Sequence, residues 1–213
     1  MKKLFNEEVE KQLKEVLANM INPITILMFT DGDCLTCKET KQLLSEVADL
    51  NSKISLEIKE IKDASLEVKQ FEIELVPSFV ILDMKKKYQG VKFNGIPAGH
   101  EINSLVSAIL EMSGLQIGVD KSLIKRIKKI NKPVNIKVFI TLACPHCPGA
   151  VQTAHRLAML NDNIKSEMIE AQTFSDMSVK YKVSGVPKII INEDIELVGN
   201  HPIEIFLEKI ESI

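Results

Sequence analysis

An internal repeat constrains this chain more than any other feature of its sequence. When the 213 residues are shifted by 110 positions, Cys34 and Cys37 meet Cys144 and Cys147. No gap is needed over residues 9–83, and other coincident pairs are Pro23 with Pro133, Phe29 with Phe139, Glu60 with Glu170, and Val76-Pro77 with Val186-Pro187. A repeat of this kind indicates two copies of one structural unit. We therefore predict two domains, over residues 1–115 and 116–213.

Each copy alternates helices and strands in the same order. In the first copy, apolar periodicity predicts helices over residues 7–20, from the first cysteine pair to about 50, 65–73 and 101–112, and strands over 24–30, 54–58, 78–83 and 91–93, with a turn at 85–90. In the second copy it predicts helices over 121–130, 145–160, 174–183 and 203–212, and strands over 134–141, 164–170, 187–192 and 195–198. This alternation predicts an α/β fold, in which each copy has a central β-sheet flanked by helices.

The whole cysteine complement lies in two Cys-x-x-Cys pairs. Each pair follows an apolar strand at the point where a helix begins, and α/β proteins form ligand sites beyond the carboxyl ends of such strands. The free N–H groups and the dipole of a helix N-terminus stabilise a thiolate. Because the thiolate is the nucleophile in disulfide exchange, the pattern predicts two redox-active sites.

Composition and charge narrow the class of protein. A formal net charge of −2 and the absence of Trp give no reason to expect nucleic-acid binding. No stretch reaches the ~18 consecutive apolar residues that a membrane-spanning helix needs, and the N-terminal segment has the charge spacing of an amphipathic helix rather than of a secretory signal. We therefore expect a cytoplasmic protein without membrane association. In that compartment a Cys-x-x-Cys pair is redox-active or binds a metal more often than it forms a structural disulfide.

The order of strand, Cys-x-x-Cys, helix and a Val-Pro 40 residues after the second cysteine resembles thioredoxin. Two such units in one chain resemble the glutaredoxin-like protein disulfide oxidoreductases of archaea and thermophilic bacteria. The segment FNGIPAGHE at 93–101 resembles the loop that these proteins carry after the first unit. The resemblance implies two tandem thioredoxin-like domains, each with a mixed β-sheet. It also implies a dithiol–disulfide oxidoreductase that forms, reduces or isomerises disulfides in protein substrates.

The same resemblance implies roles for individual residues. Cys34 and Cys144 would attack, and Cys37 and Cys147 would resolve the mixed disulfide; we expect the first cysteine of each pair at an exposed helix start and the second one turn inside. Pro77 and Pro187 would be cis. A cis bond there would expose the backbone of Val76 and Val186 to an extended substrate, a form of β-augmentation.

The second motif, Cys-Pro-His-Cys, differs from the first, Cys-Leu-Thr-Cys. Pro145 suits the first turn of a helix, and His146 can donate a hydrogen bond or a charge to the Cys144 thiolate. Both effects favour the reduced form, so we expect the second pair to have the higher reduction potential.

Proton transfer needs another group, because the position of thioredoxin's aspartate holds Met28 in the first copy and Val138 in the second. Glu60 and Glu170 are candidates, and a solvated carboxylate is the alternative interpretation of both.

Two alternatives to a general oxidoreductase stay open. One is a dedicated electron carrier that resembles the tandem-thioredoxin module of bacterial alkyl hydroperoxide reductase and serves a peroxiredoxin, although that module keeps a cysteine pair in only one unit. The other is a module that binds zinc through its cysteines. We expect no metal, since each pair has its own fold copy. No nucleotide-binding fingerprint is present, so we expect no bound cofactor. The resemblance implies an external NAD(P)H-dependent flavoenzyme of the thioredoxin reductase type as the reductant.

Overall fold

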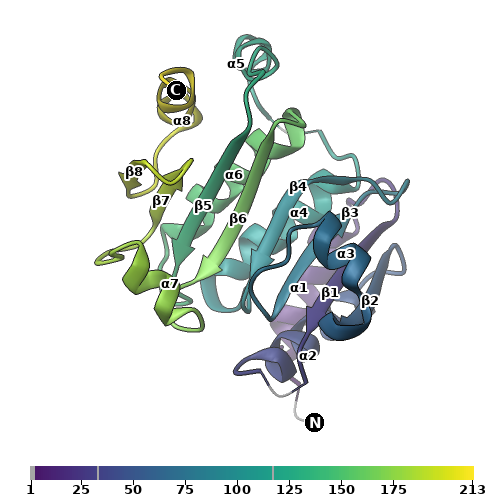
Figure 1. Cartoon of the computed structure of the whole chain (residues 1–213). Coiled ribbons are helices and arrows are strands. Elements are labelled where there is room, and N and C mark those ends of the chain that lie inside the picture. The colour runs from purple at the N-terminus through teal and green to yellow at the C-terminus, as the bar shows by residue number, and fades with distance from the viewer. Residues whose placement is uncertain (1–2, 33, 117) are drawn as a thin grey trace.

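The computed structural model describes residues 3–32, 34–116 and 118–213. The strands in this part of the chain are β1 (Ile24–Thr30), β2 (Ile54–Glu60), β3 (Ser78–Leu82), β4 (Tyr88–Asn94), β5 (Val134–Ile140), β6 (Ile164–Glu170), β7 (Lys188–Ile191) and β8 (Ile195–Val198). They form one sheet in the order β2-β1-β3-β4-β6-β5-β7-β8 (Figure 1). The order of the first four strands is repeated by the last four, as the internal repeat predicts.

The two sets of strands also share their pairing directions. β1 pairs in parallel with β2 and antiparallel with β3, which pairs antiparallel with β4. β5 stands in the same relation to β6 and β7, and β7 to β8. The sets meet where β4 and β6 run parallel, from Val91 opposite Ser166 to Asn94 opposite Ile169. The mixed α/β fold class is thereby confirmed, while the domain boundary at residues 115 and 116 stays a prediction.

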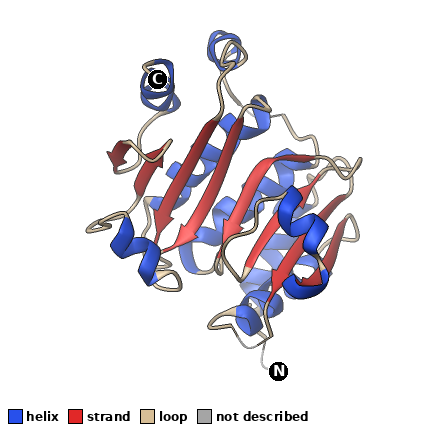
Figure 2. Ribbon diagram, viewed as in Figure 1, coloured by secondary structure: helices blue, strands red, loops and turns tan. Residues whose placement is uncertain are grey.

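The helices cover both faces of the sheet, as Figure 2 shows. They are α1 (Glu7–Leu17), α2 (Cys37–Asp49), α3 (Ser65–Gln70), α4 (Ile102–Met112), α5 (Lys121–Ile127), α6 (Cys147–Leu160), α7 (Ser175–Lys180) and α8 (Ile203–Glu211), with the 3-10 turns η1 (Ile61–Asp63) and η2 (Gly99–Glu101). One large core packs residues of α1, α2, α4, α6 and α8 against one face and runs through both units. On the other face, α3 and α7 each cover a small core of their own.

The alternation of side chains along the strands explains these layers. Ile26 and Met28 of β1 join the large core, whereas Leu27 and Phe29 point to the opposite face and pack under α3. All seven residues of β1 are buried, which is why its sequence is continuously apolar rather than alternating.

Element ends differ from the sequence-based prediction by a few residues. Helix α1 ends at Leu17 rather than at 20, and β4 begins at Tyr88, inside the predicted turn. The predicted helix from residue 145 begins at Cys147.

The seam between the two units is packed on the face of the large core. The ring of Phe93 in β4 lies 4.7 Å from that of His155 in α6, edge to face. His155 Nδ1 is 2.9 Å from Ser166 Oγ, and Arg156 of α6 forms an ion pair with Glu111 of α4. Burial lowers the pKa of His155 to about 3, so this imidazole is a neutral packing group.

Candidate active sites

Both cysteine pairs lie at the same edge of the sheet. Successive pairings make β1 and β5 parallel to each other, so their carboxyl ends, Thr30 and Ile140, point the same way. Each pair forms a disulfide within its motif, with Cα–Cα distances of 5.3 Å for Cys34–Cys37 and 5.5 Å for Cys144–Cys147. The two Cys-x-x-Cys sites that the repeat predicts therefore lie at the same end of one continuous sheet, with β3, β4 and β6 between the strands that lead to them.

The second cysteine of each pair is the first residue of a helix. Cys37 opens α2 and Cys147 opens α6, and these side chains are 3% and 0% exposed. The first cysteines precede the helices. Cys34 is half-buried and Cys144 is only 8% exposed, so neither first cysteine is fully exposed, and Cys34 is the more accessible of the two.

The second site shows how the fold serves a sulfur nucleophile. The backbone N–H of Cys147 donates to Cys144 Sγ at 3.1 Å. A hydrogen bond from a helix N-terminus to this sulfur stabilises its thiolate. On its other side, Cys144 Sγ lies 3.8 Å from the carbonyl oxygen of Val186. The residue before Pro187 is thus in contact with the reacting sulfur.

Both Val-Pro bonds, Val76-Pro77 and Val186-Pro187, are cis, as the resemblance implies. The two prolines are buried, and the valines are half-buried. The carbonyl of each proline accepts a hydrogen bond at 2.8 Å, from the N–H of Gly95 for Pro77 and of Gly199 for Pro187. The same backbone arrangement therefore recurs in the two units.

Pro145 and His146 are exposed in the turn before α6. His146 occupies the N-cap position of the helix. The hydrogen bond that stabilises Cys144 in the structure comes from the backbone of Cys147. Donation by the His146 imidazole stays a prediction.

Glu60 and Glu170 are engaged with backbone at the edge of the sheet that carries the cysteines. Glu60 accepts a hydrogen bond at 3.1 Å from the N–H of Gly32 in the loop before Cys34. Glu170, 2% exposed, accepts from the N–H groups of Gln172 and Thr173 at 3.1 and 2.6 Å. Both carboxylates thus stabilise loops, and a part for them in proton transfer stays a prediction.

Glu101 is a carboxyl that the sequence did not single out. Its side chain is fully buried, Oε2 accepts a hydrogen bond from Ser104 Oγ, and Oε1 has no hydrogen-bond partner. Burial raises its pKa to about 7. Glu101 ends η2, which packs against α6. An acid with a pKa near neutrality therefore stands beside the helix that begins at Cys147.

Glu101 belongs to the first unit. The first unit also provides a hydrogen bond to the loop before Cys144. The N–H of His100 donates to the carbonyl of Leu142 at 3.1 Å. Gly99 has φ +59°, and a Cβ there would stand 2.4 Å from the same carbonyl oxygen. Leu142 lies two residues before Cys144, so the second site is built by both units. In the sequence, the segment FNGIPAGHE at 93–101 marks this loop, but nothing there shows that Glu101 is buried.

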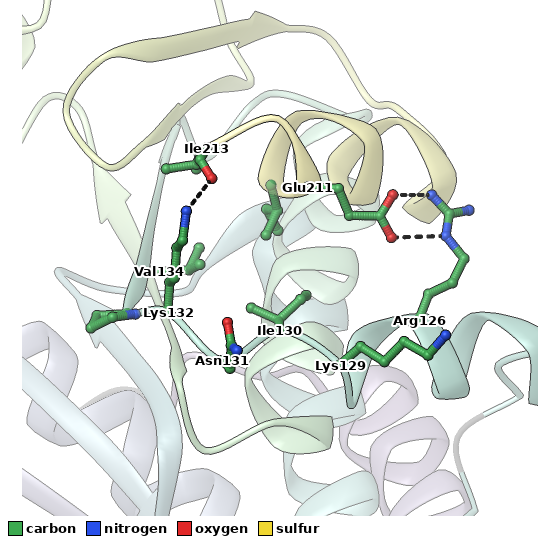
Figure 3. Close-up of a pocket in the computed structure, with 10 residues that line it drawn as sticks. Arg126, Lys129, Ile130, Asn131, Lys132, Val134, Glu211 and Ile213 are labelled. Atoms are coloured by element: carbon green, nitrogen blue, oxygen red, sulfur yellow. Dashed lines mark hydrogen bonds and ion pairs between the residues drawn. The ribbon is translucent and has the colours of Figure 1, made fainter.

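A hollow at the amino end of β5 lies away from the cysteines. A pocket of about 240 Å³ opens between the ends of α5 and α8, next to Val134 at the amino end of β5, and it carries the Arg126–Glu211 ion pair (Figure 3). Because Cys144 follows the carboxyl end of β5, this pocket is no part of the second site. Within the described ranges, no three His, Cys, Asp or Glu side chains are grouped to hold a metal ion. None of the helices there has the length and apolar character needed to cross a lipid bilayer.

Comparisons with known proteins agree with this geometry. A family model described as a thioredoxin domain matches residues 134–212. An alkyl hydroperoxide reductase of Staphylococcus aureus (strain NCTC 8325 / PS 47) is 32% identical over 209 residues, which are 98% of this chain and 38% of that protein. The NTD_N/C domain of the alkylhydroperoxide reductase of Enterococcus faecalis superposes with a TM-score of 0.92 at 31% identity, over 97% of this chain and 99% of that one.

A protein disulfide oxidoreductase from Aeropyrum pernix superposes with a TM-score of 0.90 at 31% identity, over 97% of this chain and 92% of that one. The chain belongs to the protein disulfide oxidoreductase family. The resemblance seen in the sequence is thereby confirmed. Each of the chain's two units contains a disulfide. The chain spans 38% of the length of the curated relative that it matches.

Proposed function

We propose that the protein exchanges disulfides with protein substrates at both of its sites. The observation that carries this proposal is the contact between Cys144 Sγ and the carbonyl of Val186. The backbone of Val186 is the surface along which an extended peptide can pair as an added strand. A peptide held there brings its own sulfur to Cys144.

The reaction proceeds by two thiolate attacks. The Cys144 thiolate attacks one sulfur of a substrate disulfide, a mixed disulfide forms, and the other substrate sulfur leaves as a thiolate that takes up a proton. The Cys147 thiolate then attacks Cys144 Sγ, closes the Cys144–Cys147 disulfide and releases the second substrate thiol. Two electrons pass to the substrate. The reverse sequence donates a disulfide to a substrate dithiol, and Cys34 and Cys37 act alike.

Glu101 supports the second attack. The thiol of Cys147 is buried and must lose its proton before it can attack. A carboxyl with a pKa of about 7 is half ionised near neutral pH and suits a general base. We assign Glu101 this part at the second site.

A dedicated electron carrier is the second candidate function. The relatives named as alkyl hydroperoxide reductases favour it, with a peroxiredoxin as the acceptor. In either function the two disulfides need an electron donor, and we propose an external NAD(P)H-dependent flavoenzyme of the thioredoxin reductase type. The cytoplasm, where such reductants keep dithiols reduced, is the proposed compartment.

Two experiments test the proposal. Insulin reduction by dithiothreitol is measured with and without the protein; acceleration by the wild type, and its loss when all four cysteines are replaced by Ser, is expected. A trap with Cys37→Ser and Cys147→Ser then captures partners as mixed disulfides. Many different captured proteins support a general oxidoreductase, whereas a single peroxiredoxin supports the carrier. No acceleration of insulin reduction would contradict action on protein disulfides.

A further inference from the structure

Three lysines are buried in the strands of the sheet, where charged side chains are rarely found. Lys92 of β4, Lys137 of β5 and Lys188 of β7 are 8%, 9% and 5% exposed. Removing an ammonium group from water is costly unless partners replace the water. The hydrogen-bond and ion-pair partners of each lysine therefore indicate its role.

Lys188 and Lys92 donate to the same feature of the two units. Lys188 Nζ donates to the carbonyls of Tyr181 and Lys182, at 2.7 and 3.2 Å, just past the end of α7. Lys92 Nζ donates to the carbonyl of Glu72 at 2.7 Å, just past the end of α3. Glu72 and Lys182 are equivalent in the repeat, and both have positive φ, 52° and 50°. Each ammonium thus holds the first residues after a helix.

The segment that follows each of these carbonyls leads directly to the cis-proline. Only residues 183–186 separate Lys182 from Pro187, and only 73–76 separate Glu72 from Pro77. Lys188 is itself the residue after Pro187, so its side chain closes a small loop that contains Val186. Within this loop, the carbonyl of Val186 is the group in contact with Cys144 Sγ.

The internal repeat shows that the two lysines were placed separately. A shift of 110 residues takes Lys188 to Ser78. Lys92 of β4 stands opposite Val80, as Glu196 of β8 stands opposite Ile190, so the counterpart of Lys92 in the second unit is Glu196. The lysines therefore stand on non-equivalent strands and yet donate to equivalent backbone. Their charges are balanced differently as well, because Lys188 pairs with Glu196 at 2.8 Å within its unit, and Lys92 lies 3.5 Å from Glu167 across the seam. The two units thus bring an ammonium group to equivalent backbone from different strands.

We propose that Lys188 and Lys92 are positioning residues for substrate backbone. Each ammonium fixes the segment between a helix end and the cis-proline, and so presents Val186 or Val76 in the conformation that pairs with an extended peptide. This inference rests on the proposed action on protein substrates. It predicts an effect on substrates that pair along the backbone and none on small disulfides that meet only the sulfur.

The test isolates the second site in a chain with Cys34→Ser and Cys37→Ser. The reduced protein is mixed with insulin or with 5,5′-dithiobis(2-nitrobenzoate), and the rate constant of each reaction is measured. Lys188→Met is expected to lower the insulin rate constant about tenfold, as loss of a hydrogen bond from a charged donor implies, and to leave the rate with the small disulfide unchanged. Lys137→Met is the matched control, because Lys137 is equally buried but pairs with Glu167 and Glu193; both rates should persist.

An equal fall in both rates, or no fall in either, would overturn the positioning role. If Lys188→Met fails to fold, Lys92→Met in a chain with Cys144→Ser and Cys147→Ser tests the equivalent hydrogen bond at the first site. We call this bond, from the lysine to the backbone after the helix, the tether. There, too, a selective fall in the insulin rate supports the role, and an equal fall or none overturns it.

Amide hydrogen exchange separates this inference from the proposed function. The N–H groups of Lys182 and Val183 donate to Val179 and Ser178 at 3.0 and 2.8 Å. Their exchange should be about tenfold faster in Lys188→Met and unchanged in Lys137→Met. If the parent chain reacts only with the small disulfide, the proposed function is refuted, and this exchange alone decides on the tether. Unchanged exchange in Lys188→Met would refute the tether whatever the activity.

Discussion

At the scale of single residues, Glu101 is the clearest case of chemistry that depends on folding. As a free side chain it is an ordinary carboxyl with a pKa of 4.5, but burial with one oxygen unpartnered raises the pKa to about 7. The folded state therefore binds a proton that the unfolded state has lost. The contribution of this proton to stability is complete below about pH 4.5 and is lost as the pH rises through about 7.

Replacing Glu101 by Gln removes this titration. Between pH 5 and pH 8 the free energy of unfolding of the wild type should fall by about 2.5 kcal/mol more than that of Glu101→Gln, because most of the titration between the two pKa values lies in this range. Urea denaturation at both pH values measures it. Glu60→Gln is the control, since that half-buried carboxyl is bound to the N–H of Gly32. Parallel pH profiles of wild type and Glu101→Gln would contradict the assignment of a raised pKa.

The same variant tests the catalytic part of Glu101 separately. With Cys34→Ser and Cys37→Ser in place, Glu101→Gln should slow the closing of the Cys144–Cys147 disulfide at pH 7 by roughly 100-fold, the lower range for loss of a general base. Single-turnover oxidation of the reduced protein by insulin measures this step. A stability profile that changes while the rate does not would leave Glu101 a structural carboxyl only.

At the scale of elements, periodicity predicted nearly every helix and strand, because each buries one recognisable face. Ile26, Met28, Leu27 and Phe29 alternate between two cores, and that alternation is written in the sequence. The pairing between the two units is not visible in the sequence. The parallel contact of β4 with β6 joins strands that are distant in sequence, and no pattern in Val91–Asn94 selects its neighbour. Glu101 and Lys188 were missed for the same reason, since their contacts depend on how elements are placed.

The contact of η2 with the second active-site loop gives a prediction about elements. Gly99→Ala puts a Cβ 2.4 Å from the carbonyl oxygen of Leu142, at a residue with positive φ. Gly32→Ala, in the loop before Cys34, shares the positive φ but has nothing within 4 Å. Both variants bear a backbone cost of about 1 kcal/mol, and Gly99→Ala should lose about 2 kcal/mol more through the clash. Urea denaturation measures the free energy of unfolding of both variants. Equal decreases would show that the backbone around Gly99 and Leu142 shifts to accept the Cβ at no cost.

At the scale of the whole molecule, one sheet brings two disulfides to the same edge but surrounds them differently. The loop before Cys144 is held by His100 of the other unit, whereas the loop before Cys34 is held by Glu60 of its own unit. The second motif also has Pro145 and His146 exposed before the helix, where the first has Leu35 and Thr36. The two sites therefore share the backbone arrangement at the cis-proline but have different residues beside the cysteines.

From this difference we expect the Cys144–Cys147 pair to have the higher reduction potential. Each pKa unit by which the Cys144 thiolate is stabilised is worth about 1.4 kcal/mol, or about 30 mV for a two-electron couple, so one unit suffices for a measurable gap. Each pair is replaced by Ser in turn, and the remaining pair is titrated in glutathione or dithiothreitol buffers.

Exchanging the two motif dipeptides tests the cause: Leu35→Pro with Thr36→His should raise the first potential, and Pro145→Leu with His146→Thr should lower the second. If the two pairs can exchange disulfides, electrons would then flow from the first site to the second. If the gap survives the exchange of dipeptides, it comes from the loops across the seam; if no gap exists in the parent chain, the two sites are redox equivalents and the difference in motif has no effect on potential.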